Sequence, residues 1–235
     1  LLESEGNNSL DLWQKANIFE IRRIFDECSA IPVDLTEKRE ECSFQSEQAW
    51  RKYRSDNDWD SMYPLLSGLV ELVREKAQML GDIKQTGPYD ALLDQYEPGV
   101  TSESIGREFD KLKRFLPGFL EEVMQIQERN KPVPLSGPFE IAKQRELGIQ
   151  VMASMGFDFD KGRLDVSHHP FCGGTPDDTR ITTRYNEDDF EESLMGVIHE
   201  TGHALYEQGL PSMWRNQPVG LARSMAMHES QSLLM

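Results

Sequence analysis

Hydrophobic residues recur every three to four positions through most of this chain, which is the spacing of amphipathic helices. Near the beginning, such stripes predict a helix over residues 12–28 that stops near Pro32, and a charged helix that begins at Asp34 and runs on for about twenty residues. A clearer helix is predicted over residues 66–80, with Gly81 as its C-cap. The charges on the other faces of these helices are typical of solvated surfaces.

The helical pattern continues beyond residue 81 with several interruptions. Residues 89–99 predict a short helix that ends in a Pro-Gly turn. Residues 101–130 predict two helical pieces separated by Pro117 and Gly118, and a further helix is predicted over residues 139–155. The stretch between them, KPVPLSGP, is the best candidate for a domain boundary because it is rich in proline and glycine. We therefore expect an N-terminal helical region, residues 1–130, and a second region, residues 131–235.

After residue 156 the helical spacing of hydrophobic residues gives way to short segments typical of strands. Residues 163–171 and 179–185 are rich in β-branched and aromatic residues, and Gly173-Gly174 and Pro176 separate them. They predict two strands of a small sheet. A helix is predicted next, over residues 189–204, with acidic residues from Glu187 to Asp189 in its first turn, where the helix dipole favours negative charge. Its buried stripe consists of Phe190, Leu194, Val197 and Ile198.

The last part of the chain predicts a loop and one more helix. Residues 210–218 contain two prolines and show no clear period, so we expect a connecting loop there. Residues 225–235, MAMHESQSLLM, return to a helical pattern. The chain begins without methionine and ends inside this apolar pattern, so we expect it to be an excerpt of a longer protein.

Composition narrows the classes of function. The chain has 235 residues and a net charge of −16, which argues against nucleic acid as a partner because phosphates would be repelled. It has no apolar run of membrane-spanning length and no signal peptide at its start, which argues against a membrane protein. The three cysteines include no C-x-x-C pair and are typical of free thiols in a reducing compartment, so a cytoplasmic location is expected.

The predicted helix over residues 189–204 contains an H-E-x-x-H motif formed by His199, Glu200 and His203. Positions i and i+4 lie on the same face of a helix, so the two imidazoles can bind one tetrahedral metal ion, with the glutamate placed to polarise a water molecule. A chance match to three fixed positions is expected in roughly one chain in a hundred of this size. However, all five histidines lie between His168 and His228, and this clustering favours a metal site.

A third ligand must come from elsewhere in the sequence. The metzincin pattern is excluded because Tyr206 and Gly209 stand where that pattern has glycine and histidine. The other common solution is a glutamate from a later helix, and Glu229 follows His199 by thirty positions. We therefore choose Glu229 as the third ligand. A plain surface salt bridge is the alternative role for Glu229.

Two other residues compete with Glu229. His228 is its nearest rival, but a residue next to Glu229 points about 100° away from it on a helix. Glu207 also competes, although it would more naturally support His203 from one turn away.

Four motifs in series carry a resemblance to a known family. They are HPF at residues 169–171, DTRIT at 178–182, HETGH at 199–203 and HESQS at 228–232. Together they resemble the carboxypeptidase Taq family, the thermostable-carboxypeptidase-1 type of metallopeptidase. The stretches YDALLDQYEPG, GFDFDKGRLDVS and HALYEQG are similar to the same family, so the resemblance covers at least residues 89–235.

The resemblance implies a mainly α, zincin-type metallopeptidase with a long helical groove and a small β-sheet beside the HExxH helix. It also implies homodimers that remove C-terminal amino acids from peptide substrates, with zinc (Zn2+) as the metal and cobalt (Co2+) possible. The family's two metal-binding histidines fall on His199 and His203, its catalytic glutamate on Glu200, and its third ligand on Glu229.

Four further residues are candidates for substrate binding: His169, Asp178, Thr182 and Arg180. Arg180 could meet a substrate carboxylate or pair with Asp178 to brace the strand. His169 could contact substrate or donate a structural hydrogen bond. In zinc peptidases built on this helix, an edge strand beside the metal commonly holds the peptide by main-chain hydrogen bonds.

The sequence also departs from the family pattern. An Ile/Val-Arg-x-x-Ala-Asp stretch and a Gly-x-x-Gln-x-x-His-Trp stretch, which the resemblance implies for recognition of the substrate carboxylate, are absent from these residues. We therefore expect residues 1–235 alone to be a poor or inactive carboxypeptidase and to expose apolar helix faces.

The function predicted from the sequence is that of a metallocarboxypeptidase with Glu200 as general base. Two alternatives stay open: a metallo-oligopeptidase or endopeptidase with the same helices, and a non-catalytic helical interaction protein with a structural metal site.

Overall fold

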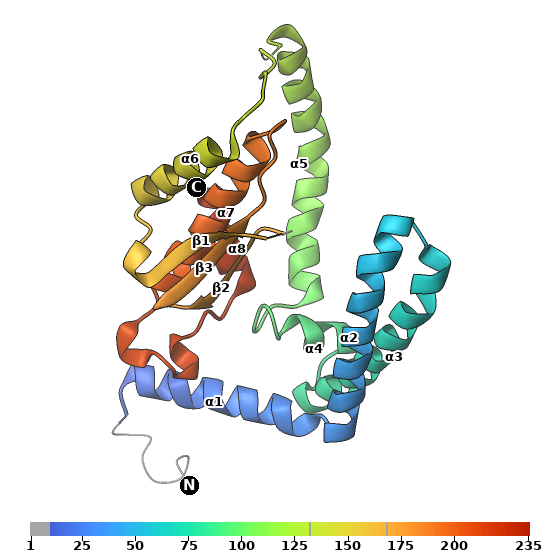
Figure 1. Ribbon diagram of the computed structural model, residues 1–235. Helices are drawn as coiled ribbons and strands as arrows, with labels where there is room; N and C mark the ends of the chain where they lie inside the picture. The colour runs from blue at the N-terminus through green and yellow to red at the C-terminus, as the bar shows by residue number, and fades with distance from the viewer. Residues whose placement is uncertain (1–9, 132, 168) are drawn as a thin grey trace. The chain divides into compact units, whose positions relative to one another are not determined.

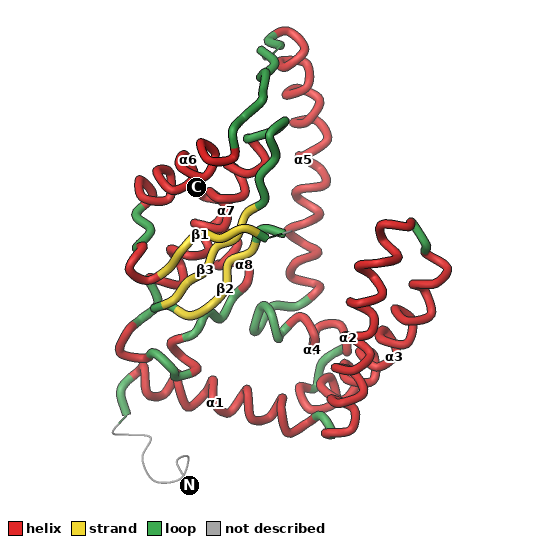
Figure 2. The backbone as a smooth tube through the Cα atoms, in the orientation of Figure 1, coloured by secondary structure: helices red, strands yellow, loops and turns green. Residues whose placement is uncertain are grey.

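Helices dominate the computed structural model, which describes residues 10–131, 133–167 and 169–235 (Figure 1). Within these residues the chain forms eight α-helices, three short 3-10 helices and one three-stranded sheet. The chain divides into two compact units, one up to Phe109 and the other from Asp110 on. All strands of the described chain lie in the second unit (Figure 2). The predicted division into residues 1–130 and 131–235 stays a prediction.

In its described residues, the first unit contains four complete helices and the beginning of a fifth, and α3 packs against the other three complete helices. The four complete helices are α1 (Leu12–Ala30), α2 (Val33–Asp56), α3 (Trp59–Lys84) and α4 (Pro88–Leu93). These elements confirm the predicted helices, with one correction. Gly81 is not the C-cap of α3, because the helix continues to Lys84 and Gln85 takes the left-handed conformation, donating its N–H to the carbonyl of Gly81. Gly81 is buried, and a Cβ there would lie 2.9 Å from the Thr86 carbonyl oxygen.

A group of ion pairs joins three segments of the first unit. Lys84 on α3 donates to Glu27 on α1 at 2.6 Å and also to Asp94, just after α4. Arg23 donates to Glu27 at 3.0 Å. Burial alone would raise the pKa of the Asp94 carboxyl, but hydrogen bonds from Lys84 and from the Gly99 N–H, together with the nearby positive charges, bring this pKa below its usual value. The charged form of Asp94 therefore stabilises the folded unit.

One long helix, α5 (Ser102–Arg129), follows the turn after α4. The sequence predicted two pieces, and this prediction was wrong because the helix runs through Pro117. Proline leaves the carbonyl of residue 113 without its intrahelical donor. None of the described side chains of α5 is buried, so water can hydrogen-bond that carbonyl and the helix continues. No helix in the described residues is long and apolar enough to cross a membrane.

The second unit is built around a sheet with the strand order β1-β3-β2 (Figure 1). Its strands are β1 (Gly162–Val166), β2 (Phe171–Thr175) and β3 (Asp178–Thr183); β1 runs parallel to β3 and β2 antiparallel to it. The register aligns Leu164, Ile181 and Cys172 in one row. Leu164 and Ile181 pack with Met152 of α6 (Ile141–Met155) and Val197 in the core, and Cys172 lies against this cluster.

The sequence predicted two of these three strands. It treated the glycine pair as a separator, which was wrong, because Gly173 and Gly174 lie within β2. Gly174 has a φ of +102°, and a Cβ there would lie 2.1 Å from the carbonyl oxygen of Asp178. The glycines therefore allow β2 to turn tightly into β3, and they mark a close backbone approach inside the sheet.

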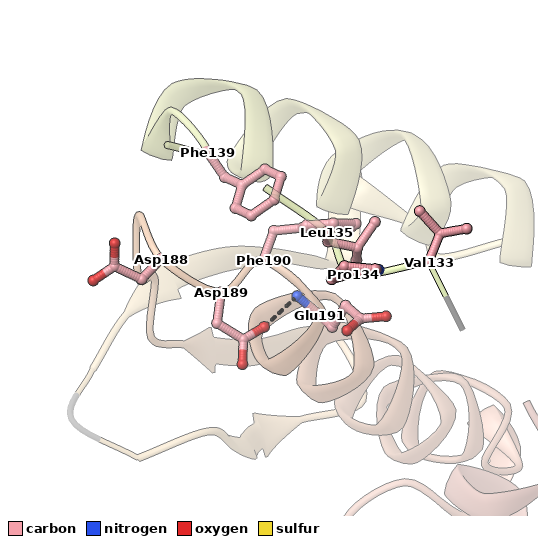
Figure 3. Close-up of a pocket in the computed structure, with 8 residues that line it drawn as sticks. All are labelled: Val133, Pro134, Leu135, Phe139, Asp188, Asp189, Phe190 and Glu191. Atoms are coloured by element: carbon pink, nitrogen blue, oxygen red, sulfur yellow. Dashed lines mark hydrogen bonds between the residues drawn. The ribbon is translucent and has the colours of Figure 1, made fainter. Parts of the chain in front are cut away.

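The HExxH helix, α7 (Glu191–Gln208), packs against β2, β3, α6 and α8 (Met225–Leu234). Asp189 accepts a hydrogen bond from the N–H group of Glu191 at 2.9 Å (Figure 3). It also accepts one from the N–H group of Glu192 at 3.2 Å. The helix therefore begins two residues after Asp189, and the acidic residues of its first turn are Glu191 and Glu192 instead of the predicted ones. The segment between α7 and α8 contains two short 3-10 helices, η2 (Ser212–Trp214) and η3 (Pro218–Gly220), where the sequence predicted a loop.

Candidate metal centre

The two histidines of the motif lie one turn apart on α7, as the spacing predicts. Their ring centroids are 4.9 Å apart and the ring planes are nearly perpendicular, at 86°. The His203 side chain is largely buried, with 11% exposed, whereas 37% of the His199 side chain is exposed. The pair therefore forms a site with a protected inner side and an open outer side.

Glu229 reaches this pair from α8. Its Oε2 lies 3.7 Å from Nε2 of His199 and 3.5 Å from Nε2 of His203. The ligand atoms of the three residues lie within 4.8 Å of one another. A tetrahedral zinc ion, about 2.0–2.2 Å from nitrogen and oxygen ligands, needs donor atoms about 3.4 Å apart. The donor set and its spacing therefore fit a divalent ion of this kind, and 48% of the Glu229 side chain is exposed, which leaves room for a fourth ligand.

A close crossing of α7 and α8 makes this convergence possible. A Cβ on Gly202 would lie 2.5 Å from Cα of Ser232 and 2.6 Å from the carbonyl oxygen of Gln231, distances that no other residue type could adopt without moving α8. Ser232 donates from its Oγ to Oε2 of Glu229 at 3.1 Å. Because Gly202 has no side chain, α8 can approach α7 closely. Ser232 helps to orient the Glu229 carboxylate.

Glu200 lies beside the donor residues, close enough to interact with the charges of His199 and Glu229, and it also contacts the sheet. Its carboxylate accepts a hydrogen bond from the backbone N–H of Cys172 on β2. Burial raises the pKa of Glu200, and the nearby charge of Glu229 raises it further, while His199 and the Cys172 N–H act in the opposite direction. Burial, with the charges of Glu200 and Glu207, also raises the pKa of the Cys172 thiol to about 12, so this cysteine is a neutral thiol.

A chain of contacts runs from Nδ1 of His203 through His228 to Glu207. Nδ1 of His203 is 2.6 Å from Nδ1 of His228, and Nε2 of His228 is 2.8 Å from Oε1 of Glu207. The expected support of His203 by Glu207 is thus made through His228 and not directly. Burial lowers the pKa of the His203 imidazole, and the neighbouring histidines lower it further, against the charge of Glu229. His203 therefore favours the neutral form, which is the form that binds a metal ion.

The sequence profile of the carboxypeptidase Taq (M32) metallopeptidases matches residues 1–235. The chain belongs to this family. Over 224 residues it is 38% identical to thermostable carboxypeptidase 1 of Thermus thermophilus, a match that covers 92% of this chain and 44% of that protein. The structure is similar to Trypanosoma cruzi metallocarboxypeptidase 1, with a TM-score of 0.88 and 41% identity over 96% of this chain and 46% of the other.

A third comparison gives the same result. The M32 carboxypeptidase from Deinococcus radiodurans has a TM-score of 0.84 and 31% identity over 96% of this chain and 45% of the other. The chain therefore spans a little less than half the length of these carboxypeptidase Taq relatives. The predicted family and its mainly helical, zincin-type fold with a small sheet beside the HExxH helix are confirmed. The long helical groove stays a prediction.

The candidate substrate residues of the DTRIT motif lie on β3. Arg180 donates to Asp178 at 2.7 Å, and both side chains are exposed. Side chains alternate along a strand, and the alternate residue Ile181 faces the core. Asp178 and Arg180 therefore point to the sheet face opposite α7. Oγ1 of Thr182 donates to the carbonyl oxygen of His169 at 2.9 Å, which fixes the β1–β2 loop. Substrate contacts by these four residues stay predictions.

Two polar residues that the sequence analysis did not single out anchor the start of α7. Oγ of Ser193 donates to Oε1 of Gln144 at 2.9 Å, and Nε2 of Gln144 donates to the carbonyl oxygens of Phe139 and Asn186, both at 2.8 Å. No local pattern marks them, because their partners are up to 49 positions away. By contrast, Gly202 carries a signal, since a glycine inside a helix costs about 1 kcal/mol and usually has a packing reason.

Two cavities lie along α7. One, of about 440 Å³, adjoins the donor residues; its lining is mainly apolar and includes Met195, Ile198 and Leu233, together with His199 and Glu200. The other, of about 330 Å³, lies at the beginning of α7 and is lined by Leu135, Phe139 and the acidic residues that precede and open the helix (Figure 3). Only the first cavity includes residues of the metal centre, so it is the one that can receive a substrate of this site.

Proposed function

We propose that this chain is the metal-binding part of a metallocarboxypeptidase that hydrolyses the C-terminal peptide bond of peptides. One observation carries the proposal: His199, His203 and Glu229 bring three ligand atoms within 4.8 Å, and the acidic Glu200 stands beside them without joining the set. A structural metal site has no use for such a carboxylate. Membership of the carboxypeptidase Taq family supports the choice of reaction.

In the proposed reaction, the metal ligands, Glu200 and Cys172 have different roles. A zinc ion held by these ligands would act as a Lewis acid and lower the pKa of water to about 7. Glu200 would accept the proton of the attacking water and later donate it to the leaving amine. The N–H of Cys172 holds the carboxylate in place, and burial makes Glu200 a stronger base than an exposed carboxylate.

The surroundings of the centre support a peptide substrate. The cavity of about 440 Å³ beside His199 and Glu200 would receive an apolar side chain next to the bond that is cut. We further propose zinc, with cobalt as the second choice, a homodimer and a cytoplasmic location for the whole protein. These finer proposals follow from the family resemblance and from the thiol state of the three cysteines.

The test uses the longest natural chain that contains these 235 residues, purified and loaded with zinc. Each peptide is offered in two forms, one with a free C-terminus and one amidated, and mass spectrometry records the products. We expect a ladder of peptides shortened one residue at a time from the free form and none from the amidated form. The same protein with Glu200→Gln is the matched control, and it should give no ladder.

Other product patterns would identify the competing functions. Internal cleavage that is equally fast for amidated peptides would indicate an endopeptidase. Stoichiometric zinc binding without hydrolysis of any peptide in the set would indicate a structural metal site.

A further inference from the structure

A partly buried chain of hydrogen bonds begins at the proposed metal ligand His203. It passes from Nδ1 of His203 to Nδ1 of His228 at 2.6 Å, and from Nε2 of His228 to Oε1 of Glu207 at 2.8 Å. The side chains of His228 and Glu207 are 21% and 26% exposed. The three residues come from two helices, since His203 and Glu207 lie one turn apart on α7 and His228 lies on α8. These hydrogen bonds therefore also link α7 to α8.

The ring of His228 has a fixed place in this arrangement. It stacks on the His203 ring, with centroids 4.6 Å apart and planes inclined by 27°. On the other side the Tyr206 ring meets it edge-on, with a centroid distance of 4.8 Å. Both nitrogens of His228 are occupied by hydrogen bonds, one to His203 and the other to Glu207. His228 therefore does not act as the third ligand, although it precedes that residue in the sequence.

The positions of the protons follow from the partners when both imidazoles are neutral. A carboxylate only accepts hydrogen bonds, so Nε2 of His228 must carry its proton and donate to Glu207. Nδ1 of His228 then has a lone pair and accepts, so the proton of His203 must lie on its Nδ1. This leaves a lone pair on Nε2 of His203, the atom that lies 3.5 Å from the Glu229 carboxylate and faces the candidate metal position.

We propose that His228 and Glu207 are positioning residues that hold His203 in the Nδ1-protonated tautomer already in the metal-free protein. This inference rests on the proposed function, and it gives a role to two residues that are not metal ligands. Without these bonds nothing would hold the proton on Nδ1, and an Nε2-protonated His203 would have to change tautomer before its Nε2 could bind the ion. Outer-shell partners of this kind typically contribute 10- to 100-fold to metal affinity.

The tautomer can be observed in the protein without metal. We would label histidine with ¹⁵N and record its long-range ¹⁵N–¹H correlations at pH 8, above the ordinary pKa of about 6.5 for imidazole. The spectrum should show His203 protonated on Nδ1 and His228 on Nε2. An Nε2-protonated His203 in the folded, metal-free chain would overturn the proposal.

Variants separate the hydrogen bonds from the packing. His228→Phe keeps a ring between His203 and Tyr206 but removes both bonds, and Glu207→Leu removes the terminal acceptor. Each should raise the dissociation constant for zinc by about 10- to 100-fold. Glu207→Gln keeps an amide oxygen that can accept from Nε2 of His228, so it should restore most of the affinity and the wild-type tautomer. Tyr206→Phe, which changes the same ring cluster without touching the chain of bonds, is the matched control.

The outcomes separate this inference from the proposed function. Unchanged zinc affinity in both His228→Phe and Glu207→Leu, with circular dichroism showing native helix content, would overturn the inference while peptide trimming still supports the proposed function. The assigned tautomers in a protein that binds zinc but hydrolyses no peptide would support the inference and count against the proposed function.

Discussion

Glu200 and His199 are neighbours in the sequence, yet their side chains meet different partners. His199 faces Glu229 on α8, and Glu200 accepts the N–H of Cys172 on the edge strand β2. Adjacent residues on a helix point about 100° apart, which lets one hold an ion while the other faces the substrate. At the scale of single residues, the proposed metal ligand and the proposed general base therefore have different partners.

Glu200→Gln tests the proposed roles directly. The amide keeps the size of the side chain but accepts no proton, so hydrolysis should fall by roughly 10²–10⁴-fold. Zinc affinity, measured by competition with a chromophoric chelator, should stay close to that of the wild type, because Glu200 is not a ligand. Turnover that survives the substitution would remove Glu200 from the mechanism.

Glu229→Ala tests the third ligand. It removes the anionic member of a set of three, so zinc affinity should fall by more than the roughly 100-fold that marks the upper range for outer-shell residues. His228→Ala should cost less, because His228 only supports His203. Titration of the metal-free proteins with zinc gives both values, and the reverse order would mean that the third ligand is misassigned.

At the scale of elements, the site depends on how closely α8 crosses α7. Gly202 is the contact point, and its missing Cβ is what lets Glu229 reach the two histidines. Because His199 and His203 lie on α7 itself, their mutual placement is local. The placement of Glu229 is a property of two helices and changes with any displacement of α8.

Gly202→Ala should therefore weaken zinc binding by about 10-fold or more, since alanine would force α8 away and outer-shell shifts of this kind cost 10- to 100-fold. The matched control on the same helix is Gly196→Ala, whose Cβ would find its nearest atoms at 3.6 Å, an ordinary contact. The control should bind zinc normally and gain up to about 1 kcal/mol in unfolding free energy from helix propensity. Equal zinc affinity in the two variants would contradict the role given to Gly202.

The elements also show how far sequence reasoning extends. Helical spacing was sufficient to place His199 and His203 together, because a period of 3.6 residues is a local property. It could not show that His228 lies between His203 and Glu207, since that requires the docking of α8. The predictions at the glycines of β2 and at the proline of α5 were wrong for the same reason. Whether such residues break an element depends on the strand or the solvent that faces them, which the sequence does not encode locally.

At the scale of the molecule, the chain combines two compact units with different kinds of stabilisation. The second unit has a small apolar core under its sheet, formed by residues such as Ile181 and Val197. The first unit adds a partly buried group of charges that joins α1, α3 and the turn after α4 through Lys84 and Asp94. Its stability should therefore depend on pH in the acid range.

Asp94→Asn tests the pH dependence. The folded pKa of Asp94 is depressed, so its contribution is complete above the unfolded value of about 3.9 and is lost as pH falls through the folded value. Urea unfolding at pH 7 should show a loss of about 1.5–3 kcal/mol in the variant, the range for hydrogen bonds to charged groups. Below about pH 4 the difference from wild type should shrink. Asp26→Asn, which breaks only an exposed pair with Arg22, should cost about 0.5 kcal/mol or less at every pH.

The proposed metal ion would link α8 to α7, because Glu229 lies on α8 and the two histidines lie on α7. The ion would close a loop of thirty positions that begins at His199. Metal binding energy is therefore also folding energy for α8. Amide hydrogens of α8 should exchange rapidly in metal-free protein and at least about 10-fold more slowly with saturating zinc, while those of α1 stay unchanged, as mass spectrometry of deuterium uptake can measure. Equal exchange with and without zinc would show that α8 docks by packing alone.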